Sequence, residues 1–320
     1  MKFKAAESLI CINDSNSSRL SLESFIDENA DCTEGILSCD KCGAKYPVIK
    51  GVAIIVDDFD KYAAERVEVF GSWLVSTKSK ELRSFLKEAG LKIPNSGNGK
   101  NKYDDSAWFR PFTWTHYDYT LEDRFLSMMR WKIKPDEIYR KVANLVENSI
   151  GNLGLDVGCS VGSAALMVAK KISFVFGIDL SFSFVSEARR RMEVMGISNV
   201  EFLVCDSTKM PFNKEYFDIV VALNLIGRLD LDKTILSINR LIKPDGKLYM
   251  ADPYDTDVQQ SRNRMTGVKL RAFLEKSGYS ITVRNKKNES FIPWIIKINE
   301  RSYVFYFLDF LEAKRLKPKC

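Results

Sequence analysis

Histidine is nearly absent from this sequence, and long apolar runs are missing altogether. The 320 residues contain one histidine, His116, so a single imidazole is available as an acid or base near pH 7. No apolar run reaches the length of a membrane-spanning helix. The opening residues MKFKAAESLICIN carry an acid where a secretory signal needs an uninterrupted apolar stretch, so we expect no secretory signal.

Blocks of basic residues are missing too. The net charge of +6 is spread along the chain and is nowhere concentrated into a basic run. A dispersed excess of positive charge indicates a solvated surface. Weak attraction to RNA or to an anionic substrate is the alternative interpretation. The hydrophobic share of 45% and the charged share of 28% are typical of a soluble globular protein, and the length suffices for two domains.

Cysteine is present in an odd number. A large chain whose cysteines are odd in number and mostly unpaired in spacing is typical of a reducing compartment. We therefore predict a cytoplasmic protein with no membrane partner. The seven cysteines are Cys11, Cys32, Cys39, Cys42, Cys159, Cys205 and Cys320.

Three parts of the chain differ in pattern. Residues 1–57 hold short alternating segments and end in the strand-like GVAIIVDD, whereas residues 58–134 look helical around a polar loop at 95–105. Residues 135–320 begin with a helical spacing of apolar residues and then alternate strands with helices, which predicts a mostly parallel α/β sheet covered on both faces. The expected strands are 154–157, 174–180, 200–206, 218–224 and 247–252, and DKTILSINRLIKPDG has the sequence of a helix ending in Lys, Pro and Gly.

The turn LDVGCSVGS follows the first of these strands, where an open parallel sheet binds its ligand. Dinucleotide sites use G-x-G-x-x-G, but Ser160 stands at the middle glycine position. Asp156 would also repel a pyrophosphate, which argues against a nicotinamide oxidoreductase. The same acid suits a positively charged ligand attached to a nucleoside, and S-adenosylmethionine is such a ligand.

Two more strand ends carry acids. Asp179 ends the second strand, where a carboxylate can accept from both ribose hydroxyls. Asp206 ends the third strand beside Ser207, where the pair can bind an adenine edge. The alternative interpretation is that these residues cap helices, since Asp and Ser are common N-caps.

The motifs LDVGCSVGS, GIDLS, CDSTKMPFNKEYFDIVVALNLIGRL and LIKPDGKLYMADPY resemble those of class I S-adenosylmethionine-dependent methyltransferases over residues 135–320. The resemblance implies a Rossmann-like seven-stranded sheet with an antiparallel last strand, closed by SITVRNKKNESF and RSYVFYFLDFLEAKR. It also implies a set of cofactor-binding residues, namely Asp156, Gly158, Cys159, Gly162, Asp179, Leu180, Asp206, Ser207 and Asn224.

The motifs that could indicate the methyl acceptor are less specific than those that indicate the cofactor. NLIGRL and DPY are similar to the mercaptohistidine N-methyltransferases, although that branch carries an acid at Gly227. The resemblance suggests methyl transfer to nitrogen, sulfur or oxygen of a small molecule, amino-acid-like or imidazole-containing. An RNA or peptide methyltransferase with the N-terminal module for docking, and a non-catalytic cofactor-binding protein, are the alternatives.

Candidate catalytic residues are Asn224, His116 and Tyr254. Asn224 ends the fourth strand, and the Asn/Asp-Pro-Pro-aromatic run of adenine-N6 enzymes does not follow it. The Pro-Cys nucleophile of cytosine-C5 enzymes is absent as well. His116 lies in WFRPFTWTHYDY, an aromatic segment that either covers the cofactor as a lid or packs as a wedge between domains, and the histidine is either catalytic or structural.

The segment ILSCDKCGAKYPVIKGVAIIV resembles the second half of small zinc ribbons that accompany RNA and protein methyltransferases. Those ribbons use C-x-x-C twice, and here the first pair reads CIND. Zinc accepts carboxylate oxygen, so Cys11, Asp14, Cys39 and Cys42 could form a site, with Cys32 as a further thiol. Loss of one ligand nevertheless favours a ribbon that has kept its fold without the metal.

Overall fold

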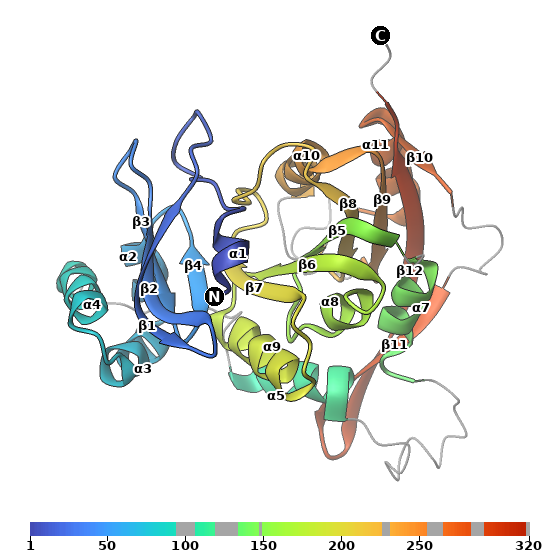
Figure 1. Ribbon diagram of the computed structural model, residues 1–320. Coiled ribbons are helices and arrows are strands. Elements are labelled where there is room, and N and C mark those ends of the chain that lie inside the picture. Colours follow the sequence, from blue (N-terminus) through green and yellow to red (C-terminus); the bar gives the residue numbers. More distant parts are fainter. Residues whose placement is uncertain are drawn as a thin grey trace.

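The computed structural model describes residues 1–93, 106–118, 134–146, 149–225, 231–254, 265–282 and 291–317. One mixed sheet of twelve strands runs through these residues, with helices on both faces (Figure 1). The loop expected at 95–105, part of NLIGRL and part of SITVRNKKNESF lie outside the described residues.

Seven strands form the class I sheet that the resemblance implies, with its antiparallel last strand. They run β7-β6-β5-β8-β9-β12-β10 across the sheet, with β12 antiparallel to both of its neighbours in that order. The predicted fold class is therefore confirmed. The strands are β5 (Ser149–Val157), β6 (Ile172–Asp179), β7 (Val200–Cys205), β8 (Phe217–Leu223), β9 (Ile242–Asp252), β10 (Tyr279–Ile281) and β12 (Ser302–Arg315), and β11 (Phe291–Asn299) forms a hairpin with β12.

The central strands are apolar because both of their faces are covered. All six residues of β7 are buried, and so are most residues of β6 and β8, as expected for parallel strands between two helical layers. One predicted boundary is wrong. The helix expected through Gly246 ends earlier, as α10 (Leu231–Leu241), because Ile242 already pairs with Phe217 in the sheet and Pro244 cannot continue a helix.

Two apolar layers flank the sheet. One contains side chains of α7 (Glu137–Leu145), α8 (Ser163–Val168) and α9 (Phe182–Val194). The other contains side chains of α10, α11 (Gly267–Lys276) and the short α1 (Phe3–Ala6). The molecule is thus a three-layer sandwich around one sheet.

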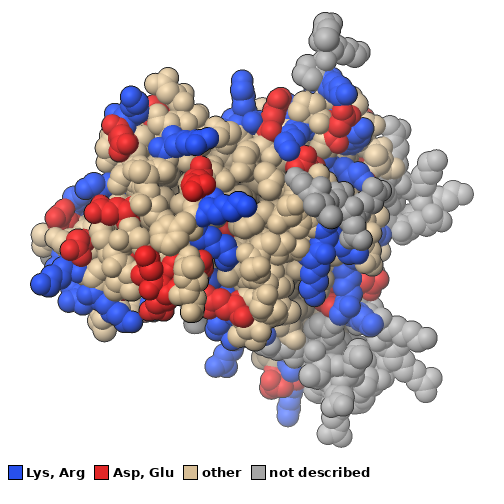
Figure 2. Space-filling view, in the orientation of Figure 1, with Lys and Arg blue, Asp and Glu red and all other residues tan. Residues whose placement is uncertain are grey.

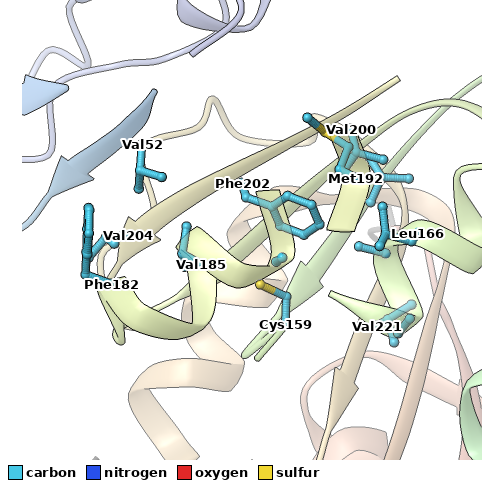
Figure 3. Close-up of a cluster of buried hydrophobic side chains, with 14 of the residues drawn as sticks. Val52, Cys159, Leu166, Phe182, Val185, Met192, Val200, Phe202, Val204 and Val221 are labelled. Atoms are coloured by element: carbon cyan, nitrogen blue, oxygen red, sulfur yellow. The ribbon is translucent and has the colours of Figure 1, made fainter. Parts of the chain in front are cut away.

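The N-terminal strands extend this sheet. β1 (Ser21–Glu28), β2 (Asp31–Ser38), β3 (Lys45–Ile49) and β4 (Val52–Ile55) form an antiparallel run, and β4 then pairs in parallel with β7. Figure 3 shows Val52 of β4 in the same buried cluster as Val204 and Phe182. The N-terminal module and the class I sheet therefore share a core, while the domain limits at 57 and 134 stay predictions.

The remaining helices lie on the face that carries α9. They are α2 (Phe59–Ala64), α3 (Val67–Ser76), α4 (Lys80–Lys92), α5 (Ser106–Thr113) and the π-helical turn η1 (Trp114–Asp118). The fully buried Trp73 packs edge-on against Phe182 at 4.8 Å between ring centroids, which joins α3 to α9. Among the helices that the structure describes, none is long and apolar enough to cross a membrane.

A buried charge cluster joins the N-terminal strands to the class I core. Arg189 of α9, which is 7% exposed, contacts Asp31 at 2.6 Å and the fully buried Glu201 at 3.4 Å. A Cβ atom on Gly51 would lie 2.6 Å from the Arg189 Nε atom, so the turn between β3 and β4 closes directly over the guanidinium group. Arg189 therefore compensates two acids from different parts of the chain.

We expect Arg189→Ala to lower the free energy of unfolding by about 3 kcal/mol or more, because it leaves the buried Glu201 carboxylate without its cation. The matched control is Arg190→Ala, since Arg190 is exposed and forms an ion pair with Glu187 at the surface. Removing that surface pair should cost less than about 1 kcal/mol. Urea unfolding of both variants measures the difference, and equal losses would contradict the role given to Arg189.

Candidate active site

The strand order reverses between β5 and β8. From β5 the chain continues outward to β6 and β7 on one side, and to β8 and β9 on the other. Crossover connections leave the sheet in opposite directions at such a point, so a crevice opens at the carboxyl ends of the two strands. Asp156 is the last residue but one of β5, and Asn224 directly follows the last residue of β8.

Two glycines shape the turn after β5. Gly158 and Gly162 have φ angles of +70° and +91°, a region that side chains rarely adopt. A Cβ atom at Gly158 would lie 2.1 Å from the Leu225 side chain, and one at Gly162 would lie 2.8 Å from the Phe202 ring. The turn therefore depends on glycine at both positions.

Asp156 is buried beneath this turn. One carboxylate oxygen accepts the backbone N–H of Ala165 at 3.0 Å, and the side chain is 2% exposed. Burial, with a smaller contribution from the negative charge of Asp179, raises the pKa of Asp156 to about 7. A positively charged ligand beside it would favour the ionised carboxylate.

Asp179 joins the turns that follow β5 and β6. Its carboxylate accepts the backbone N–H of Ser160 at 3.0 Å and of Ser181 at 2.9 Å. Ser181 in turn caps α9 by accepting the Phe184 N–H. The helix cap is thus Ser181, while the neighbouring acid organises the strand ends.

The remaining predicted cofactor residues differ in exposure. Asp206 is exposed, and its carboxylate accepts the N–H and the hydroxyl of Thr208, both at 2.8 Å. Ser207 is buried with its hydroxyl 3.2 Å from that of Thr234. Leu180 is partly buried, and its carbonyl accepts the Tyr62 hydroxyl at 2.9 Å. The Cys159 side chain lies in the buried cluster of Figure 3, and its backbone N–H donates to the Ile178 carbonyl at 2.9 Å.

A cavity lies over the ends of β5 and β8. Asn224, with φ +57°, is fixed there by a backbone hydrogen bond to Ala251 at 2.7 Å. The Asn224 Oδ1 and Ser160 Oγ atoms are buried and have no partner among the described residues, and both are available to a polar ligand. The cavity is lined by Phe112, His116, Tyr139, Asp156, Gly158, Cys159, Ser160, Ala164, Phe184, Leu223, Asn224, Leu225 and Trp294.

The aromatic segment predicted at 108–119 closes this cavity from the other side, through α5 and η1. Thr115 donates its hydroxyl to the Ile295 carbonyl of β11 at 3.0 Å, and Tyr117 donates to the Val161 carbonyl of the glycine turn at 2.7 Å. Phe112 packs against Phe184 of α9 at 5.6 Å between ring centroids. Tyr119 lies outside the described residues.

His116 lies at the inner surface of this segment. Its Nε2 atom is 2.7 Å from the Tyr139 hydroxyl, and its side chain is 6% exposed. Burial lowers the pKa of His116 to about 3 and raises the pKa of Tyr139 well above its usual value. Both groups are therefore neutral near pH 7, so a buried, uncharged imidazole faces the strand ends.

Tyr254 does not line this cavity. Its hydroxyl donates to Asp309 at 2.8 Å, and the Arg271 guanidinium binds the same carboxylate at 2.6 and 2.8 Å. Tyr254 has a φ angle of +55°, and its N–H donates to the Asp252 carboxylate at 2.6 Å. The structure thus brings Asn224 and His116 together and holds the Tyr254 hydroxyl in a separate polar cluster.

Three thiols of the N-terminal module lie close together, outside the cavity described above. The sulfur atoms of Cys11, Cys39 and Cys42 lie within 4.8 Å of one another. Burial opposes ionisation of Cys39, but backbone hydrogen bonds from Cys42 and Lys41 outweigh it, so the pKa of Cys39 is lowered. Asp14 is not part of this group, because its carboxylate accepts the N–H groups of Asn16 and Ser18 at 3.3 and 3.0 Å.

The described residues supply no fourth ligand to the three thiols. Structural zinc sites are usually four-coordinate and closed. Cys32, the further thiol considered from the sequence, is fully buried against Gly35 of β2 and is also not part of the group. The donor set therefore does not fit a closed zinc site.

The sequence predicted neither Tyr139 nor Trp294 as a site residue. Tyr139 follows Ile138 on the helix whose apolar spacing was recognised, and α7 confirms that helix. A tyrosine on the buried side of a helix usually needs a partner for its hydroxyl. That requirement is the one feature of the sequence that could have indicated Tyr139 as a site residue. Trp294 comes from β11, far along the chain, and carried no signal.

Residues 152–289 match the family model of a methyltransferase domain. A protein named methyltransferase GfsG from Streptomyces halstedii is 33% identical over 107 residues, which cover 32% of this chain and 38% of that protein. Phosphoethanolamine N-methyltransferase 1 from Zea mays is 26% identical over 160 residues, 46% of this chain and 32% of that enzyme. The chain thus spans between about a third and two fifths of the length of these curated relatives.

Among solved structures, the chain is similar to magnesium protoporphyrin IX methyltransferase from Synechocystis PCC 6803 with bound S-adenosylmethionine. The sequences are 20% identical, the match covers 67% of this chain and 94% of that one, and the TM-score is 0.46. The family match covers the strands that form the switch point, together with the glycine turn and the acids at the strand ends. Residues 152–289 therefore carry a methyltransferase domain, and the sheet that contains them has the class I strand order.

Proposed function

We propose that this protein is an S-adenosylmethionine-dependent methyltransferase that acts on nitrogen or sulfur of a small molecule. The observation that carries the proposal is the meeting of two buried acids at the glycine turn: Asp179 accepts the backbone N–H of Ser160 in the turn, and Asp156 accepts that of Ala165 in the helix that follows it. When bound, the cofactor supplies a methyl group on a positively charged sulfur.

The proposed roles follow from charge and position. Asp156, with the backbone of Gly158 and Gly162, would bind the charged methionine part of the cofactor. Asp179 would accept from the ribose hydroxyls. The unpartnered Oδ1 atom of Asn224 would orient either the cofactor or the acceptor. Orientation and exclusion of water can supply most of the rate for nucleophiles that are already reactive when neutral.

The acceptor class follows from what the cavity contains. Its described lining has one imidazole, and the low pKa of His116 makes that imidazole a weak base. Oxygen nucleophiles of low acidity need a stronger base than this. The other lining group that titrates near neutral pH, Asp156, is assigned to the cofactor, so nitrogen and sulfur are favoured over oxygen. RNA is not favoured by the face in Figure 2, where basic and acidic side chains intermix. The six free cysteines among the described residues support a reducing, cytoplasmic location.

The acceptor can be found by incubating the untagged protein with isotopically labelled S-adenosylmethionine and separated metabolite, peptide and RNA fractions of its host. We expect label in one low-molecular-mass product. Asp179→Ala protein serves as the control for enzymes that copurify. Label confined to RNA or peptide would overturn the small-molecule assignment.

Asp179→Ala should weaken the binding of S-adenosylhomocysteine by about tenfold to a hundredfold. The change removes hydrogen bonds to a charged acceptor, worth roughly 1.5–3 kcal/mol each at most. Titration calorimetry measures the affinity, with the exposed Asp245→Ala as the matched control. Unchanged affinity, or tighter binding of NADH than of S-adenosylhomocysteine, would show that the pocket is assigned wrongly.

Binding of S-adenosylhomocysteine should strengthen as the pH rises from 6 to 8. In the free protein Asp156 has a pKa of about 7, and a ligand ammonium group beside it would lower that pKa, so binding releases a proton. The dependence can reach about tenfold per pH unit for one proton. Calorimetry in two buffers of different ionisation enthalpy measures the release.

Adenosine, which lacks the amino-acid part, is the matched control ligand and should bind independently of pH over this range. Asp156→Asn should remove the pH dependence for S-adenosylhomocysteine. Affinity that falls with rising pH would contradict the placement of Asp156 beside the ammonium group.

The thiol cluster leads to a separate expectation. We propose that the N-terminal module is stable without zinc, because β4 anchors it to β7 and the three thiols lack a fourth ligand among the described residues. Protein purified without chelators should carry well below one zinc ion per chain. Cys39→Ser should lower the melting temperature by less than about 3 °C, the effect of roughly 1 kcal/mol in a chain of this size. One tightly bound zinc ion, with a large loss of stability on chelation, would contradict this.

A further inference from the structure

His116 has an unsatisfied ring nitrogen. Its Nε2 atom faces the Tyr139 hydroxyl at 2.7 Å, whereas Nδ1 is buried without a partner among the described residues. The residue lines the cavity over the strand ends. A buried polar atom without a partner is costly, so a ligand that satisfies it gains affinity.

Burial determines which nitrogen carries the proton. The low pKa of His116 makes the ring neutral, with one N–H, and the raised pKa of Tyr139 keeps its hydroxyl protonated. The buried Tyr139 proton needs an acceptor, and Nε2 is the atom within reach. Nε2 therefore accepts, and the imidazole proton lies on Nδ1. His116 then offers a hydrogen-bond donor to the cavity.

The opposite wall offers an acceptor. Asn224 Oδ1 is also buried without a partner among the described residues, and Asn224 lines the same cavity. The rings of Phe112, Phe184 and Trp294 form much of the remaining lining, and no lysine or arginine is among the described lining residues. A flat, uncharged molecule with adjacent acceptor and donor atoms is complementary to such a surface.

We propose that His116 donates its Nδ1–H to the methyl acceptor, that the acceptor carries a planar amide or thioamide edge, and that Tyr139 is the positioning residue for the imidazole. This inference rests on the proposed function. It assigns His116 to the acceptor and not to the cofactor for two reasons. His116 comes from the aromatic segment that closes the cavity opposite the strand ends, and the cofactor is assigned to the strand ends. A cofactor carboxylate would also be better bound by a cation than by a neutral ring.

The single histidine allows a direct test of the tautomer. Untagged protein labelled with ¹⁵N-histidine gives one imidazole in the NMR spectrum. We expect a protonated Nδ1 and an unprotonated Nε2 from pH 5.5 to 8, with no titration near 6.5, the ordinary pKa of histidine. Tyr139→Phe should shift the tautomer toward Nε2–H. A ring that titrates normally, or that carries its proton on Nε2 in the wild type, overturns the proposal.

Binding measurements test the acceptor class. Pyridine-2-thione has a planar N–H and C=S edge, and 2-mercaptonicotinate is its carboxylated counterpart. Each is titrated by calorimetry into protein saturated with S-adenosylhomocysteine. We expect the thione to bind at least tenfold more tightly than the anion. Equal affinities for the two compounds, or no binding of the thione at millimolar concentration, would overturn the proposal that the methyl acceptor is uncharged.

Three variants separate contact from structure. His116→Asn keeps an N–H near the Nδ1 position and should bind the thione within about threefold of the wild type. His116→Leu and Tyr139→Phe should each lose about fivefold to tenfold, the range of one neutral hydrogen bond. S-adenosylhomocysteine affinity should change less than twofold in all three.

The cofactor titration also separates the two proposals. A parallel loss of S-adenosylhomocysteine affinity in His116→Leu and Tyr139→Phe assigns His116 to the cofactor and overturns this inference, while the methyltransferase proposal stands. Wild-type protein that does not bind S-adenosylhomocysteine overturns the proposed function itself, and this inference with it.

Discussion

The carboxylate of Asp179 holds together the two turns on which the site depends. By accepting the N–H groups of Ser160 and Ser181, it links the glycine turn after β5 to the start of α9. Both bonds are charge-assisted and share the buried Asp179 carboxylate, so neither turn can move without taking a partner from a buried charge. Because the strand order reverses beside β5, this link also fixes where the crevice opens.

The N-terminal strands extend the same sheet beyond β7. Parallel pairing of β4 with β7 removes the free edge that the class I sheet would otherwise have beside β7. It also brings Asp57, which follows β4, within 2.7 Å of Lys209, which follows β7 near Asp206. The module thus adds backbone and charge to the end of the sheet that carries the strand-end acids.

Much of the fold could be predicted because parallel strands buried on both faces give short apolar runs, and an acid or amide follows each run at a strand end. The extension of the sheet by the N-terminal strands, through the pairing of β4 with β7, could not be predicted. The run Val52–Ile55 is apolar throughout and does not indicate its partner strand. The Tyr139–His116 contact joins residues 23 positions apart in different elements. Asp14 was grouped with the thiols by spacing alone, whereas local backbone N–H groups bind its carboxylate.

The electrostatic character of the cavity follows from burial, which shifts the pKa values of His116 and Asp156 in opposite directions. Burial lowers the pKa of His116 to about 3 and raises the pKa of Asp156 to about 7. Near neutral pH the imidazole is uncharged, and the carboxylate is close to its midpoint. The described lining adds no fixed cation. A positively charged ligand therefore meets an acid that can ionise in response to it, while an uncharged acceptor meets only hydrogen-bonding groups and aromatic rings. These are the conditions under which position, more than proton transfer, decides the rate.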